Sequence, residues 1–166
     1  MALTQAEFNR LVEEHGPALY RIAYRMLGDS HEAEDVVQDA FRSAWKSRSR
    51  YDPGRGDRAW LAAILRRRVI DLWRRHRPPA TFSGDYAPEI GVAAEDPFEQ
   101  EFSDEVQAAL MRLPEELRET LLLVVVGELT HQEVADLLDV PLGTVLSRVS
   151  RARTRLRGYL LACAGS

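Results

Sequence analysis

The sequence has 166 residues, 45% of them hydrophobic and 29% charged, which suffices for one modest core or two small ones. No apolar run approaches the roughly 20 residues of a membrane span, and the N-terminus carries neither the basic start nor the apolar segment of an export signal. We therefore expect a cytoplasmic protein with no membrane contact of its own. Cys163 is the only cysteine, which excludes an internal disulfide and a cysteine-rich zinc site.

The net charge of −4 conceals a strong segregation of charge along the chain. Residues 42–77 contain twelve Lys or Arg and three acids, residues 78–105 contain eight acids and no base, and residues 148–157 contain five Arg and no acid. Because phosphates dominate the affinity of proteins for nucleic acids, two basic blocks indicate two contacts with one polyanion. Two solvated helix faces are the alternative that composition leaves open.

Helical periodicity begins at the N-terminus. A capping box at Thr4 to Glu7 starts a first helix, and Gly16-Pro17 separates it from a second helical stretch that Gly28 ends. Asp29 to Glu32 is suited to cap the next helix. Over 33–45, apolar residues recur at alternating spacings of three and four, which predicts a helix with one buried stripe.

Residues 46–57 contain Pro and Gly among charges and predict a loop, after which a further helix runs over 58–75. The segment 78–102 is acidic and lacks apolar periodicity, which is typical of a flexible linker. The linker divides the chain into a domain over 1–77 and a domain over 103–166. No strand-like alternation is present, so the predicted fold class is all-α, with two small helical domains joined by a flexible acidic linker.

The strongest pattern in the C-terminal domain is a helix-turn-helix. A capping box at Thr130 to Glu133 begins a short helix, residues 139–141 form a turn, and an arginine-rich helix follows. The second helix of such a unit enters the major groove of DNA. Helical spacing predicts a common outer face made of Arg148, Arg151 and Arg155. We expect Arg148, nearer the helix start, to read a base, and Arg151 to contact a phosphate.

Several of these segments resemble bacterial sigma factors. Leu113-Pro114, Arg118, residues 130–138 and the run 141–153 resemble the fourth-region domain of that family. Residues 29–41 resemble the second-region segment that grips RNA polymerase, and Arg58 to Leu61 with Ile70-Asp71 resembles the helix that reads the melted promoter element. The matches follow the family's order without a third-region domain between them, which points to the extracytoplasmic-function group.

The resemblance implies a factor that directs promoter-specific transcription initiation by binding core RNA polymerase and promoter DNA. Catalysis would belong to the polymerase, so the chain is not expected to be an enzyme or to need a cofactor or metal, and an anti-sigma factor is an expected further partner. The residues implied to bind core polymerase are Glu34, Asp35, Gln38, Asp39 and Phe41. Those implied to bind the −10 element are Lys46, Arg50, Tyr51, Arg58, Arg66, Arg67, Asp71, Arg74 and Arg75. Those implied to bind the −35 element are Thr130, Gln132, Thr144, Ser147, Arg148, Ser150, Arg151 and Arg155.

Four positions depart from the family's usual pattern. Arg67 stands in place of Asn, Asp139 in place of Gly, Leu146 in place of Lys and Ser150 in place of His. Arg67 bears on specificity for the melted element, and Leu146 removes one phosphate contact. Asp139 suits the turn, because Asp tolerates the left-handed conformation better than most residues.

Three other functions are compatible with parts of the sequence. A repressor or activator would use only the helix-turn-helix, with 1–77 as a ligand or dimerisation domain. A metal-dependent nuclease would use the acidic helix face of Glu32, Asp35 and Asp39, and a pure interaction module would leave the arginine face unexplained. We expect Trp45, Trp60 and Trp73 to belong to the core and Tyr51 to stack on an unpaired base. The linker acids are expected to lie against the arginine faces in the free protein.

Overall fold

The computed structural model describes residues 3–76 and 104–164 of the chain. Every regular element in these ranges is a helix, so the predicted all-α fold class is confirmed, and no helix there is long and apolar enough to cross a membrane. The predicted linker over 78–102, and with it the expected contacts of its acids, lies outside the described residues. The elements are α1 (Gln5–Leu27), α2 (Ser30–Lys46), α3 (Asp57–His76), α4 (Asp104–Arg112), α5 (Glu115–Val125), α6 (His131–Leu138) and α7 (Leu142–Ala164).

The predicted helix ends are confirmed where a side chain or a left-handed residue forms the cap. Both capping boxes are complete, the first at Thr4 before α1 and the second at Thr130 before α6. Asp29 caps α2 by accepting a hydrogen bond from the backbone N–H of Glu32 at 3.0 Å. Gly28 ends α1 with φ 73°, where the absence of a Cβ removes the strain.

The expected break at Gly16-Pro17 is wrong, because α1 continues through it as one helix of 23 residues. Proline costs an interior helix one backbone hydrogen bond, so packing must offset that loss. The buried face of α1 runs without interruption on both sides of Pro17, from Leu11 at 6% exposure to Leu19 at 0% and Ile22 at 1%. A break would take one half of this face out of the core.

The segment between α2 and α3 is irregular, as expected for residues 46–57. It contains two short 3-10 turns, η1 (Arg48–Arg50) and η2 (Pro53–Arg55), and no α-helix. Trp60, just after the start of α3, is buried, and Trp73 packs against the core from the other end of the helix. Trp45 is half-buried beside Phe8, with ring centroids 5.1 Å apart.

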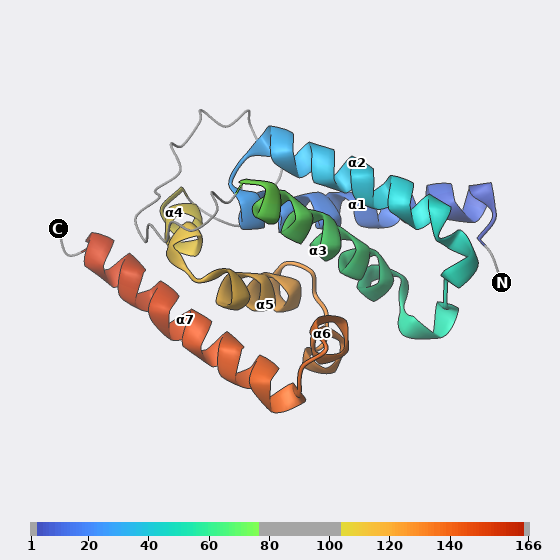
Figure 1. Cartoon of the computed structure of the whole chain (residues 1–166). Helices are drawn as coiled ribbons and strands as arrows, with labels where there is room; N and C mark the ends of the chain where they lie inside the picture. Colours follow the sequence, from blue (N-terminus) through green and yellow to red (C-terminus); the bar gives the residue numbers. More distant parts are fainter. Residues whose placement is uncertain (1–2, 77–103, 165–166) are drawn as a thin grey trace.

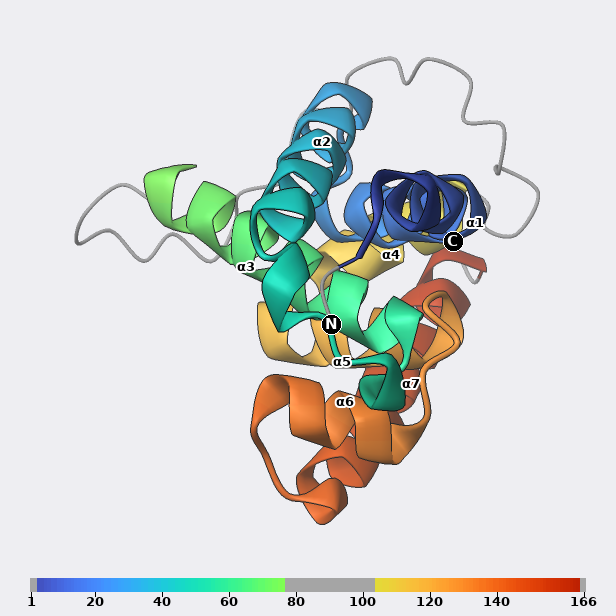
Figure 2. The same ribbon diagram turned by 90° about the vertical axis from the view of Figure 1, so that its right-hand side faces the viewer.

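The N-terminal helices α1 to α3 and the C-terminal helices α4 to α7 pack directly on each other (Figure 1). Helix α1 contacts α4 and α5, and α3 contacts α6. The buried side chains of both groups form one continuous cluster, in which Ile22 and Met26 of α1 lie in the same core as Leu110 and Leu122. Figure 2 shows α5 and α6 stacked below the N-terminal helices in a second view. The described residues therefore form a closed arrangement of two helical units.

Candidate nucleic-acid interface

The helix-turn-helix predicted from the sequence is present in α6 and α7. Asp139 connects the helices with φ 56° and ψ 51°, the left-handed conformation that short polar side chains tolerate. Val145 at 0% exposure, Val149 at 7% and Ala152 at 0% anchor α7 in the core. Helix α7 packs against α4, α5 and α6 and runs along one edge of the molecule, with its outer face directed away from the other helices (Figure 1).

The arginines of α7 do not all share the outer face. Arg151 and Arg155 are exposed. The side chain of Arg148 is only 18% exposed, and its Nη2 lies 3.9 Å from Oε2 of Glu116 on α5. Arg148 is therefore turned toward α5, at the side of the helix. The expected division, with Arg148 as the base reader, fits this geometry less well than the reverse assignment.

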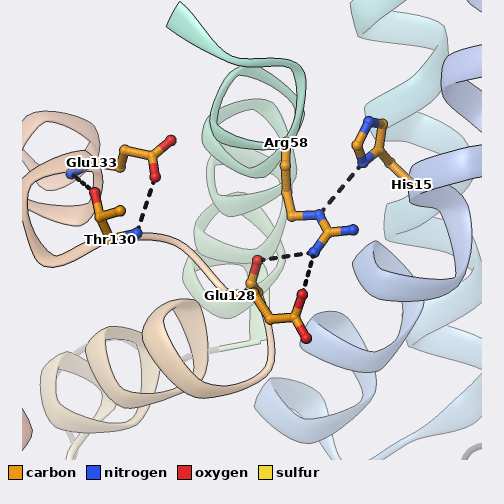
Figure 3. Close-up of polar contacts among 6 residues, drawn as sticks. His15, Arg58, Glu128, Thr130 and Glu133 are labelled. Carbon is orange, nitrogen blue, oxygen red and sulfur yellow. Dashed lines mark hydrogen bonds and ion pairs between the residues drawn. The ribbon is translucent and has the colours of Figure 1, made fainter.

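The other residues expected at the −35 element occupy the same end of the molecule. Thr130 caps α6, and Gln132 is exposed and donates a hydrogen bond to Asp136 at 3.0 Å. On α7, Ser147 and Ser150 are exposed and Thr144 is half-buried. The backbone N–H and hydroxyl of Thr130 are both used by the capping box with Glu133 (Figure 3). Thr130 thus positions α6 whether or not it touches DNA.

The expected polymerase-binding residues line the outer side of α2. Glu34, Asp35 and Gln38 are exposed, whereas Phe41 is half-buried and packs edge-on against Phe8 with centroids 6.3 Å apart. Asp39 accepts a hydrogen bond from Arg42 at 3.2 Å. We define the acidic face as Glu34, Asp35, Gln38 and Asp39.

A groove of about 480 Å³ joins the acidic face to the end of α3. Its walls include Asp35 and Asp39 from α2 and Arg75 and His76 from α3. Burial, then the nearby Asp29 carboxylate, raises the pKa of Glu32 in this groove, and His76 at 3.5 Å partly opposes the shift. Asp35 and Asp39, expected to bind polymerase, and Arg75, expected to bind DNA, therefore line the same groove.

Most basic residues expected at the −10 element are exposed. They lie at the end of α2, in the loop that follows it and along α3, where the carboxylate of Asp71 is 3.7 Å from Arg68. The exposed members of the set are Lys46, Arg50, Arg67, Arg74 and Arg75. Two further members, Arg58 and Arg66, are held by acids of the C-terminal unit.

Arg66 forms a bidentate ion pair with Glu119 of α5. Its Nε donates to Oε2 at 2.9 Å and its Nη2 to Oε1 at 3.2 Å. The Glu119 side chain is 6% exposed and that of Arg66 27% exposed, so water competes little for this pair. The parallel geometry is the strong form of the arginine–carboxylate interaction. In the closed arrangement the Nε–Nη2 edge of the Arg66 guanidinium is therefore occupied by Glu119 and is not available to a phosphate.

Arg58 is engaged in a similar way at the start of α3 (Figure 3). Its Nη1 donates to the carboxylate of Glu128 at 3.1 Å and to the carbonyl of Gly127 at 3.4 Å, and its Nε donates to Nδ1 of His15 at 3.4 Å. Glu128 has φ 57°, which is uncommon for a residue with a side chain. Burial lowers the pKa of His15, so its imidazole is the neutral acceptor that Arg58 requires.

Arg118, a buried residue with 7% exposure, joins the two units through its guanidinium. It donates to four carbonyl oxygens: Met26 at the end of α1 at 2.8 Å, and Leu110, Met111 and Leu113 at the end of α4 at 2.9, 3.1 and 3.0 Å. Helix C-termini leave carbonyls without intrahelical partners, and a cation there is favourable. Burial lowers the pKa of Arg118. This contact explains structurally why Arg118 belongs to the sigma-like pattern.

Gly127 and Gln107 of the C-terminal unit also lie close to side chains of α1. A Cβ on Gly127 would lie 2.6 Å from the carbonyl oxygen of Leu123 and 3.2 Å from Cδ1 of Ile22 on α1. Arg25 of α1 donates to the amide oxygen of Gln107 on α4 at 3.0 Å.

Tyr51 lies against the protein. Its ring meets Trp60 edge-on at 5.2 Å, and its hydroxyl donates to Asp57, which raises the pKa of Tyr51 to about 12. Base stacking by Tyr51 would require that this contact break.

The sequence alone did not predict the contacts of Glu119, Glu128 and Gly127, because their partners lie 53, 70 and 105 positions away in the chain. No periodicity signals such contacts. Glu119 stands between Arg118 and Thr120, and nothing in this local pattern indicates its partner on α3.

Two family matches cover the described units. Residues 11–78 match sigma-70 region 2, and residues 103–156 match sigma-70 region 4. The ECF RNA polymerase sigma factor SigW of Bacillus subtilis is 32% identical over 94% of the chain and 90% of its own length. The chain belongs to the ECF sigma factor family. It therefore serves in transcription initiation by RNA polymerase, and the repressor and nuclease hypotheses are set aside.

The chain is also similar to other sigma factors. SigE of Mycolicibacterium smegmatis is 37% identical over 92% of the chain, although the chain spans only 61% of that relative's length. The solved structure of the sigma factor RpoE in complex with the anti-sigma factor NepR from Bartonella quintana superposes with a TM-score of 0.73. The match has 26% identity and covers 92% of this chain and 96% of that one, so it includes both helical units.

Within residues 3–76 and 104–164, no group of three His, Cys, Asp or Glu is placed to hold a metal ion.

Proposed function

We propose that this sigma factor binds core polymerase through the acidic face of α2 and reads a promoter with two separate surfaces. The helix-turn-helix of α6 and α7, with its exposed arginines and no acid on α7, is the observation that carries the proposal. It supplies a duplex reader for the −35 element. The exposed arginines of α3 supply a positively charged surface for the melted −10 strand. The reaction itself belongs to the polymerase, in the cytoplasm.

On the −35 side, Arg151 is the base reader in our proposal and Arg148 the phosphate contact. Arg151 is exposed on the outer face, whereas Arg148 is turned aside toward Glu116. An arginine turned back toward the body of the protein is nearer the phosphates that flank the groove, and one on the outer face can reach the base edges.

The closed arrangement cannot serve both promoter elements at once. A compact chain of this length is roughly 40 Å across, whereas elements about 25 base pairs apart are separated by about 85 Å on B-form DNA. Arg58 and Arg66 are also occupied by acids of the C-terminal unit. We infer that core polymerase separates the two units, which frees both arginines for the −10 strand.

An anti-sigma factor is the proposed inhibitor. The matching Bartonella structure contains such a partner, and the present arrangement of both units resembles the sigma chain of that complex. A partner that binds both units in this arrangement would keep the factor away from polymerase.

The experiment is a competition for core polymerase in native gels. Reversal of Asp35 and Asp39 to Lys is expected to weaken core binding at least tenfold, because two exposed charges at a charged interface are inverted. Glu13→Lys, an exposed reversal on α1, is the matched control and is expected to bind as the parent does. Equal core affinity of the double variant and the control would contradict the proposal.

A further inference from the structure

Two leucines are exposed on the first turns of α7. Leu142 is 40% exposed and Leu146 is 48% exposed, while Val145 and Val149 on the adjacent side are 0% and 7% exposed. Leu142 and Leu146 are four residues apart, so they lie one above the other on the helix. The core does not include these two leucines, so their exposed side chains are available to contact a binding partner.

The leucines belong to the outer face that the helix-turn-helix presents. At about 100° per residue, Leu146 lies on one side of that face and Arg151 on the other. Gly143 and Ser147 lie between them, and a Cβ on Gly143 would meet no atom within 4 Å. Short side chains along the centre allow close approach of a flat or concave ligand, with the leucines and Arg151 at its two margins.

The charge of the helix selects the ligand. Residues 142–164 contain five arginines and no acid, so a polyanion neutralises this surface and an ordinary apolar protein patch does not. In a helix-turn-helix the N-terminal residues of the second helix face the base edges. The leucines occupy those N-terminal positions, and most arginines follow on later turns, nearer the phosphates.

We propose that Leu146, supported by Leu142, recognises the C5-methyl group of a thymine in the −35 element. This proposal rests on the proposed function, in which α7 binds that element as duplex. The thymine methyl is the apolar group that base pairs display in the major groove. A leucine offers no hydrogen bond, so it selects thymine by burying that methyl against its own. One buried methyl corresponds to about a fourfold change in affinity.

The experiment uses holoenzyme assembled from core polymerase and the full chain, on promoter duplexes that this holoenzyme selects from random DNA. Each thymine of the −35 element, on either strand, is replaced singly by deoxyuridine, which removes only the methyl group. We expect one or two replacements to weaken parental binding about fourfold each. In the Leu146→Ala holoenzyme, the deoxyuridine that replaces the thymine contacted by Leu146 is expected to have no effect on binding. Arg151→Ala is the matched control and is expected to keep the sensitivity to deoxyuridine.

The outcomes separate this proposal from the one it rests on. If the holoenzyme selects a −35 sequence but no deoxyuridine weakens binding, or if Leu146→Ala keeps the same sensitivity, thymine recognition by Leu146 is overturned and the proposed function stands. If no −35 preference is selected at all, the proposed function fails as well. Because Leu146 is exposed, its alanine variant is expected to fold, and thermal unfolding checks this directly.

Discussion

Arg66 and Glu119 form a bidentate ion pair between α3 and α5, with both N–O distances at or below 3.2 Å. Arg66 is among the residues expected to bind the −10 strand, and Glu119 belongs to the unit expected to bind the −35 element. The same arginine therefore has two competing acceptors, a carboxylate of its own chain and a DNA phosphate. This competition links the arrangement of the two units to DNA binding.

Glu119→Gln should raise the DNA affinity of the free factor. The amide keeps the shape but removes the charge that holds Arg66, so the closed arrangement loses stability. A loss of about 1.4 kcal/mol would raise the population competent to bind, and the apparent affinity, about tenfold. Fluorescence anisotropy with a single-stranded −10 oligonucleotide at low salt measures this. Glu13→Gln, an exposed change on α1, is the control, and equal affinities for the two variants would refute the competition.

Arg118→Met should destabilise the fold by about 3–4 kcal/mol. The apolar side chain fills similar space but leaves four carbonyl oxygens at the ends of α1 and α4 without donors. Arg118→Lys should recover part of this loss, because one ammonium reaches some of the carbonyls but not all of them. Urea unfolding followed by circular dichroism gives both values. A loss below about 1 kcal/mol for the methionine variant would show that water replaces the guanidinium.

Acidification should weaken the fold through His15. Burial lowers the pKa of His15, while the unfolded chain keeps the ordinary value of 6.5. As the pH falls below that value the unfolded state binds the proton first, so the stability that neutral His15 contributes is present above pH 6.5 and is lost below it. Protonation also removes the acceptor of Arg58. The free energy of unfolding, measured from pH 8 to pH 5, should fall more steeply for the parent than for His15→Gln; parallel curves would be the contrary result.

Loss of the Arg151 side chain and loss of the Arg148 side chain should affect DNA binding in different ways. Arg151→Ala is expected to cost about 1–3 kcal/mol at one base pair of the −35 element and much less when that pair is already mismatched. Arg148→Ala is expected to weaken binding evenly across sequences and to lower the salt slope by about one. Binding of holoenzyme to a −35 substitution series at several salt concentrations distinguishes them. The opposite pattern would restore the expectation drawn from the sequence, in which Arg148 reads the base because it is nearer the helix start.

Local chemistry explains which parts of the fold could be predicted from the sequence. The caps at Thr4 and Thr130 and the left-handed Asp139 depend on residues within four positions, so the pattern contains the whole interaction. The continuity of α1 through Pro17 depends on packing against other helices, and the periodic pattern does not contain that energy. The proline rule therefore gave a break that tertiary packing removes.

The candidate site divides in the same way. Helical spacing placed Arg151 and Arg155 on an exposed face, but the orientation of Arg148 depends on Glu116, a residue of another helix. The pairs of Arg66 with Glu119 and Arg58 with Glu128 bridge 53 and 70 positions. Such pairs require that the relative placement of two helical units be known. A row of arginines in a sequence shows where positive charge lies and not which carboxylate holds it.

Run-off transcription with purified core polymerase tests the central claim most directly. The account predicts that adding the chain yields transcripts that start at discrete genomic promoters, and that these are strongly reduced by Arg151→Ala and by reversal of Asp35 and Asp39 to Lys. A second sigma factor that activates the same core preparation serves as the positive control. If that control transcribes its own promoters while the folded chain directs no promoter-specific transcript, the account is contradicted.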